Sequence, residues 1–194
     1  ITWQERGLFP FMHARPFVAG GAVYVLGHDQ DLCVIRSDDQ GETWSDPVRL
    51  TEGQHWHQSA CNVHHANGNV HLVMERRVRF EIRGWPVGEL APVLMRGPEE
   101  ADLTRSESWT FAEELPFCAI EGDPKLIGVP FWAPGPTDPG SSQNDRKMNP
   151  IGWLETNVVQ FVDPDHIWTD PSGRTFHLWM RAHTGSTGLT CIAK

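Results

Sequence analysis

The chain has 194 residues, the composition of an ordinary globular domain and a formal net charge of -9. This negative balance argues against a nucleic-acid partner, which would require clustered Lys and Arg. No apolar run approaches the roughly 20 residues of a membrane-spanning helix, so we expect no membrane partner either.

The chain begins at Ile1 without a Met or a signal-peptide pattern, and we therefore expect it to be part of a longer protein. The compartment stays open, although a secreted or periplasmic location is favoured if the full-length protein carries a signal peptide. No C-x-x-C spacing occurs, so free thiols are favoured over a zinc site or a disulfide framework for Cys33, Cys61, Cys118 and Cys191.

The first fifty residues predict four antiparallel strands, at 11–17, 22–27, 32–36 and 45–50. Gly20-Gly21 predicts a tight hairpin turn between the first two. Counting outward from it pairs Ala19 with Ala22 and places His13 opposite His28, with Arg15 two residues deeper on the same face.

The turn before the fourth strand reads S-x-D-x-G-x-T-W, from Ser37 to Trp44. Asp39 can accept hydrogen bonds from backbone N–H groups of its own turn, and Gly41 supplies a backbone angle that other residues avoid. Trp44 is expected to fold back as an apolar plug. The pattern predicts a rigid hairpin corner.

The strand series then restarts, with predicted strands at 57–65, 69–77, 93–96 and 111–115 and an insertion at 84–92. Asn67-Gly68 is a strong hairpin signal, and 102–109 is a degenerate copy of the first turn that keeps Trp109. A third unit begins at 155–160, turns at 170–173 and continues at 176–181 and 189–193.

The S-x-D-x-G-x-T-W turn resembles the Asp-box, or BNR repeat, of sialidase-like β-propellers. The resemblance implies an all-β propeller, of which the chain holds two full blades and a partial third in a single partial domain spanning 1–194. We expect blade one at about 11–50, blade two at about 57–115, a loop insertion at 118–153 and a partial third blade at 155–194. With Phe131 and Trp132 the insertion would form a lid or a sugar-stacking wall, or it is a disordered insertion.

In such a blade the start of the first strand and the end of the second lie at one rim, and the resemblance implies that this rim surrounds the ligand pocket. Polar residues converge there, as in ligand sites, although strand ends are also polar because water reaches them. The candidate catalytic residues are His13, His28 and Asp29. The candidate substrate-binding residues are Arg15, His57, Gln58, Glu75, Arg76, Arg77, Glu155, Asn157, Arg181 and His183.

The arginines suggest a carboxylate-bearing sugar, because a guanidinium binds a carboxylate through two parallel hydrogen bonds. His13-Ala14-Arg15-Pro16 is similar to the F/Y-R-I-P motif of sialidases, which would give Arg15 the role of a carboxylate-binding arginine. His57-Gln58-Ser59 and 85–90 look like propeller enzymes that act on rhamnose-glucuronate caps of plant arabinogalactan, an α-L-rhamnosidase and a lyase.

We therefore expect a glycoside hydrolase that cleaves a terminal glycosidic bond next to or within an acidic sugar, a sialic or uronic acid. The alternatives are a non-catalytic carbohydrate-binding propeller and a lyase. The histidines could also do no more than hydrogen-bond neighbouring loops. His55 and His57 share one strand face, but a metal site needs three or more convergent ligands, and we expect neither a metal nor another cofactor.

Overall fold

The computed structural model describes residues 2–57, 61–81, 86–116 and 152–183. Within these ranges the regular structure is almost entirely β, with two short 3-10 helices, η1 (Val87–Glu89) and η2 (Ser106–Ser108). No helix in the described ranges is long and apolar enough to cross a membrane. The all-β prediction is confirmed.

The first sheet is an antiparallel meander in the order β1-β2-β3-β4. Its strands are β1 (Met12–Ala19), β2 (Ala22–Asp29), β3 (Asp31–Ser37) and β4 (Val48–Arg49). Gly20 and Gly21 have φ angles of 54° and 79°, the double left-handed conformation of a two-residue hairpin turn that matches the twist of its strands. The outer strand is shorter than predicted, because only Val48 and Arg49 pair with β3.

The second sheet contains β5 (Trp56–His57), β6 (His64–Ala66), β7 (Asn69–Arg77), β8 (Leu90–Pro98) and β9 (Thr110–Phe111). The single strand predicted at 57–65 is wrong, because β5 and β6 are separate segments that both pair with β7. The predicted 84–92 insertion is also too long, since the β7–β8 ladder already includes Arg77 opposite Leu90.

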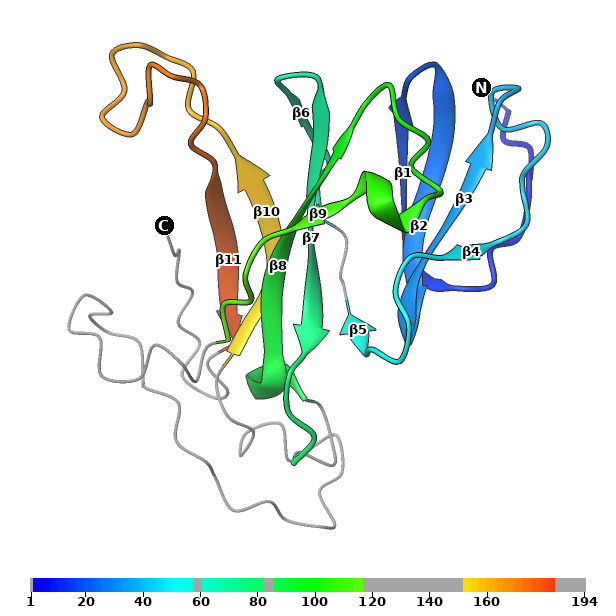
Figure 1. Cartoon of the computed structure of the whole chain (residues 1–194), viewed down its shortest axis with the longest axis horizontal. Helices are drawn as coiled ribbons and strands as arrows, with labels where there is room; N and C mark the ends of the chain where they lie inside the picture. Colours follow the sequence, from blue (N-terminus) through cyan, green and yellow to red (C-terminus); the bar gives the residue numbers. More distant parts are fainter. Residues whose placement is uncertain (1, 58–60, 82–85, 117–151, 184–194) are drawn as a thin grey trace.

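The third sheet pairs β10 (Gly152–Val159) with β11 (His177–His183). β10 starts three residues before the predicted start, where Gly152 lies against the backbone of η1: a Cβ on Gly152 would meet the carbonyl oxygen of Val87 at 2.1 Å. The three sheets stand side by side in chain order, as the blades of a partial propeller do (Figure 1). Most of the predicted insertion lies outside the described residues, as do Phe131 and Trp132.

The main hydrophobic core lies between the first two sheets. Tyr24 is 1% exposed and stacks on Phe17 with ring centroids 5.5 Å apart. Alternate residues of β2, β3, β7 and β8 complete the core, including Leu26, Leu32, Val34, Val70, Leu72, Met74, Val93 and Met95. The period of two along these strands follows from the alternation of side chains across a sheet.

The Asp39 turn has the hydrogen bonds expected of a rigid corner. Asp39 accepts bonds from the backbone N–H and the hydroxyl of Thr43 at 2.8 and 2.6 Å, and Gly41 has a φ of 90°. These hydrogen bonds from Thr43 and Ser37 lower the pKa of Asp39 to about 2. Trp44 is only half-buried and packs edge-on against Phe9, so the expected plug is covered by the N-terminal segment.

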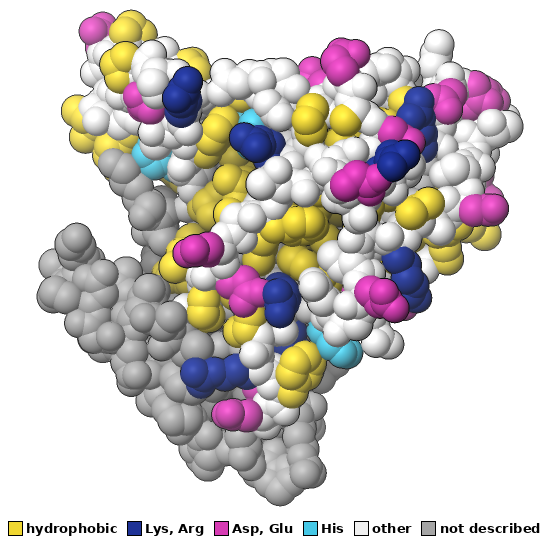
Figure 2. Space-filling model, in the orientation of Figure 1, with side chains coloured by type: hydrophobic (Ala, Val, Ile, Leu, Met, Phe, Trp, Pro, Cys, Tyr) yellow, Lys and Arg dark blue, Asp and Glu magenta, His cyan; other side chains and the backbone are white. Residues whose placement is uncertain are grey.

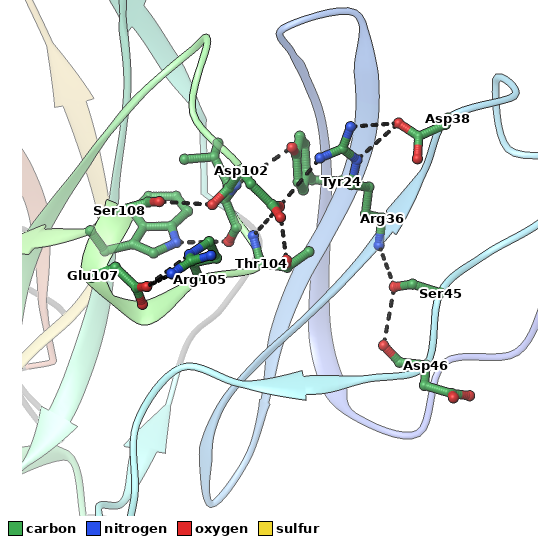
Figure 3. Close-up of polar contacts among 12 residues, drawn as sticks. Tyr24, Arg36, Asp38, Ser45, Asp46, Asp102, Thr104, Arg105, Glu107 and Ser108 are labelled. Atoms are coloured by element: carbon green, nitrogen blue, oxygen red, sulfur yellow. Dashed lines mark hydrogen bonds and ion pairs between the residues drawn. The ribbon is translucent and has the colours of Figure 1, made fainter.

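The degenerate second turn has a different structure. Its Trp109 is 6% exposed, belongs to the main core and donates a hydrogen bond from Nε1 to the Leu103 carbonyl. Arg36 lies between Asp38 of the first turn and Asp102 of the second and contacts both (Figure 3). Ion pairs of Arg36 therefore connect the outer corners of the two sheets. Positively and negatively charged side chains are mixed on the exposed surface of this face (Figure 2).

Candidate functional site

A β-bulge reshapes the predicted pairing of His13 with His28. The register runs as predicted from Ala19 opposite Ala22 to Arg15 opposite Leu26, and then shifts so that Met12 lies opposite His28. The extra residue leaves His13 with a φ of 51°. Such a bulge re-aims a side chain, and His13 Nδ1 comes within 3.2 Å of His28 Nε2 although the two residues are not register partners.

The third sheet repeats this geometry. Its register shifts between Leu154, opposite Arg181, and Asn157, opposite Trp179, and within the bulge Glu155 has a φ of 59°. Arg181 donates two hydrogen bonds to the Glu155 carboxylate, at 2.6 and 2.9 Å. Counted from the bulges, the pair of Glu155 and Arg181 occupies the same place as His13 and His28 in the first sheet.

The second sheet carries its polar pair at the corresponding strand end. His57 lies directly opposite Glu75 in the β5–β7 ladder, and its Nδ1 is 3.0 Å from Glu75 Oε2. Glu75 is fully buried, with 0% of its side chain exposed. Because the carboxylate can only accept, His57 Nδ1 carries the proton, and a neutral His57 ring has its lone pair on Nε2.

Three imidazole rings therefore gather between the first two sheets. Ring centroids are 5.4 Å apart for His13 and His28, 5.3 Å for His13 and His57, and 6.0 Å for His28 and His57. Together with the Glu75 carboxylate they form what we call the histidine cluster. Two of its members were predicted as catalytic residues and two as substrate-binding residues.

The surroundings of His28, which is buried, and of His13, which is exposed, both favour a neutral imidazole. Desolvation, with the neighbouring His57 and His13, lowers the pKa of His28 to about 4. Desolvation and His57 also lower the pKa of His13, while the Glu75 carboxylate partly offsets this. A neutral imidazole at neutral pH can accept a proton, which is the property required of a general base.

The predicted arginines are all engaged within the protein. Arg15 is 4% exposed and donates to the carbonyl oxygens of Asn62 and Val73, at 3.2 and 2.6 Å. These bonds link β1 to the second sheet and leave the Arg15 guanidinium almost inaccessible to solvent. The other three pair with carboxylates: Arg76 with Glu114, Arg77 with Glu89, and Arg181 with Glu155.

The remaining predicted site residues lie outside the cluster. Asp29 ends β2, and its carboxylate is 3.5 Å from the Arg49 guanidinium. Asn157 accepts a hydrogen bond from the Asn62 backbone at 3.0 Å and so helps to join the second and third sheets. Gln58 lies outside the described residues, and for His183 only the backbone is described, paired with Gly152.

Sequence reasoning did not foresee the structural role of two polar residues, Asn62 and Asp31, that hold this region together. Asn62 donates to the Val158 carbonyl at 2.7 Å and accepts from its N–H at 2.8 Å, as a strand backbone would. Asp31 accepts from the backbone N–H groups of Gly53 and Gln54 and from the Thr51 hydroxyl. Burial alone would raise the pKa of Asp31, but these bonds and the Arg49 charge together lower it.

Within the described ranges, no group of three or more His, Cys, Asp and Glu side chains is placed to hold a metal ion. His55, one of the two histidines considered for metal binding, precedes β5 and contacts Phe80 edge-on at 5.0 Å. Cys33 and Cys61 are free thiols, as predicted, while Cys118 and Cys191 lie outside the described residues.

A scan of protein-family models found no match, and neither did a search of curated protein sequences. Two solved structures are similar. An alpha-L-arabinofuranosidase from Lactobacillus brevis has 16% identity and a TM-score of 0.45 over 95% of this chain and 47% of that chain. Bacteroides ovatus xyloglucan PUL GH43B has 12% identity and a TM-score of 0.22 over 93% and 45%.

The chain thus spans about half the length of these two structures. Likenesses of this size carry no conclusion about the activity of this chain. Neither of the two is described as a sialidase or a rhamnosidase, so the resemblance to those families stays a hypothesis.

Proposed function

We propose that the histidine cluster is the proton-transfer centre of a carbohydrate-active enzyme that cleaves a glycosidic bond. The observation that carries the proposal is the meeting of three imidazoles beside one fully buried carboxylate, Glu75. Here Glu75 orients His57, burial lowers the pKa of His28, and partial desolvation together with His57 lowers the pKa of the more exposed His13, an arrangement that resembles tuned acid–base sites.

An acidic sugar remains the favoured substrate, with Arg181 as its carboxylate receptor. Arg181 is about two-fifths exposed, whereas Arg15 is buried. The hydrogen bonds and charge of Glu155 raise the pKa of Arg181, and the Glu75 charge adds a smaller contribution, which puts this guanidinium within electrostatic reach of the cluster. An incoming carboxylate would exchange with Glu155 for the same two-pronged hydrogen bonds.

Two cleavage mechanisms fit an acidic substrate. A glycoside hydrolase commonly uses two carboxyl groups, and Glu75 with the exposed Asp29 would have to supply them. A lyase instead needs a base that removes the proton beside the sugar carboxylate, and the neutral imidazoles of His13 and His28 favour it as the second candidate. A lyase leaves an unsaturated uronate that absorbs ultraviolet light, whereas a hydrolase does not.

The test is an assay of the full-length protein on sialosides and on rhamnosyl-glucuronate glycans, with His28→Gln and Glu75→Gln as variants. The control is His65→Gln, which removes an exposed histidine paired with Glu99 in the same sheet. We expect a loss of turnover of about 100-fold or more in the cluster variants only. Full activity in both cluster variants would refute the proposal, and sugar binding without turnover would favour a carbohydrate-binding protein.

A further inference from the structure

A second cavity lies at the other end of β7 from Glu75. It has a volume of about 460 Å³ and lies between the hairpin of β6 and β7 and the turn that precedes β11. Its lining is strongly polar and comprises Asn67, Asn69, His71, Arg96, Ser172, Arg174 and Phe176. None of these residues belongs to the histidine cluster.

The cavity has a fixed frame. His71 lies opposite Arg96 in the β7–β8 ladder, so the two side chains are neighbours on one face of the sheet. Phe176 stacks on the His71 ring, with centroids 4.3 Å apart and an interplanar angle of 29°. Asn67 Nδ2 donates to the Gly173 carbonyl at 2.8 Å and ties the two walls together.

Several donors of this cavity have no partner in the described structure. His71 is 3% exposed, and its Nδ1 is buried without a hydrogen-bond partner. Arg96 and Arg174 form no ion pair with any described residue, whereas the two predicted substrate-binding arginines of the same sheet, Arg76 and Arg77, are paired. A buried polar atom without a partner is costly, which makes the His71 ring nitrogen a candidate ligand contact. Arg96 and Arg174 are exposed to solvent beside it, so their guanidinium groups are accessible to an incoming anion.

The cavity lining contains no carboxylate that could supply the acceptor. The nearest acidic turn residue is Asp170, whose carboxylate accepts from the hydroxyls of Ser172 and Thr175, at 2.6 and 2.7 Å. These bonds lower the pKa of Asp170 to about 2 and hold its charge in its own turn. The cavity therefore offers donors and positive charge, in a chain whose net charge is -9.

We propose that this cavity binds an oxyanion, a sulfate or a carboxylate, carried by a ligand of about monosaccharide size. Arg96 and Arg174 would approach the anion from the second sheet and from the turn before β11. His71 would bind it through Nδ1, in the tautomer that carries the proton on that nitrogen. Asn69 lines the same cavity, and its amide nitrogen, which donates to the Asn67 carbonyl at 2.7 Å, has a second hydrogen to offer. The proposal does not depend on the activity of the histidine cluster, which lies in a separate place.

Calorimetric titration of the full-length protein with sodium sulfate, glucuronate and glucose, at constant ionic strength, tests the site. We expect sulfate, glucuronate or both to bind, and glucose not to. Arg96→Gln and Arg174→Gln should each weaken binding about 10-fold or more, since a charge-assisted hydrogen bond contributes about 1.5–3 kcal/mol. The matched control is Arg105→Gln, which removes an exposed arginine paired with Glu107.

A nuclear magnetic resonance titration locates the binding independently of affinity. The ring resonances of His71 should move on adding sulfate or glucuronate, while those of His28 stay in place. No binding of either anion, equal binding of glucose, or undiminished binding in both arginine variants would overturn the proposal. Anion binding that shifts only the histidine cluster would overturn it as well.

Discussion

Lowering the pH should reduce the free energy of unfolding over a pH range that is set by the two pKa values of His28. The pKa of His28 in the folded state is about 4, below its ordinary value of 6.5, because burial and the neighbouring His57 and His13 disfavour its charged form. Between these two values the unfolded chain binds the proton and the folded chain does not. Stability from this residue is therefore fully present above about pH 6.5 and is lost progressively as the pH falls toward 4.

The size of the effect follows from the two pKa values. The pKa values of His28 in the unfolded and folded chain differ by about 2.5 units. At about 1.36 kcal/mol per unit, the loss of unfolding free energy has an upper limit of about 3.4 kcal/mol. At about pH 5 the expected loss is roughly 2 kcal/mol. Asp39 and Asp170, with pKa values of about 2, lose their contribution only below the ordinary carboxyl range and so outside this window.

The assay is denaturant unfolding of the full-length protein and of its His28→Gln variant at a series of pH values from about 7 to about 4. The test compares the slopes of unfolding free energy against pH and not the absolute values, because the substitution also removes the contact with His13 and so lowers stability at every pH. We expect the unfolding free energy of the unmodified protein to fall more steeply than that of the variant. Parallel curves, or a His28 ring that titrates near 6.5 by nuclear magnetic resonance, would refute the reasoning.

Substitutions at four further positions test the frame of the site. Gly21→Ala should lower the free energy of unfolding by about 1–2 kcal/mol, because an Ala is strained in the left-handed backbone conformation. Gly20→Ala should lower it further, because the new Cβ would also meet the Glu99 carbonyl oxygen at 2.6 Å. Thermal unfolding of the two variants compares them. Asn62→Ala should destabilise by about 1–3 kcal/mol through its lost bonds to β10, measured as a lower denaturant midpoint. His13→Gly should be about 1 kcal/mol more stable than His13→Ala at the φ of 51°, with turnover lost in both; equal stabilities would contradict the bulge.

The strands and turns were predictable where local rules agree with packing. Gly20-Gly21 and Asn67-Gly68 form left-handed two-residue turns, as their sequences predict, and β7 has the predicted limits. Apolar alternation also identified the strands of the main core. Strand ends were less predictable, because ladder bonds to a neighbouring strand decide them: β8 extends beyond its predicted 93–96 at both ends along β7.

The candidate site was predictable in its membership but only partly in its geometry. Counting from the turn placed His13 across from His28, and the bulge that shifts this register has no glycine or other sequence mark. The prediction that Arg15 binds a carboxylate rested on residue type and on a short motif resemblance, yet Arg15 is buried and its guanidinium donates to the Val73 carbonyl. Sequence shows which charges exist, whereas only the packed sheets show which of them are already paired.

The repeated pairs explain how a regular sheet can build an irregular site. In a flat ladder, the side chains of neighbouring residues point to opposite faces, so His13 and His28 would contact only if they were register partners. A one-residue bulge relaxes that constraint at the strand end and leaves the core positions further along in register. The first and third sheets use the same bulge to hold different pairs, two imidazoles and the ion pair of Glu155 with Arg181. Chemistry at this rim can therefore change from sheet to sheet while the ladder that supports it stays the same.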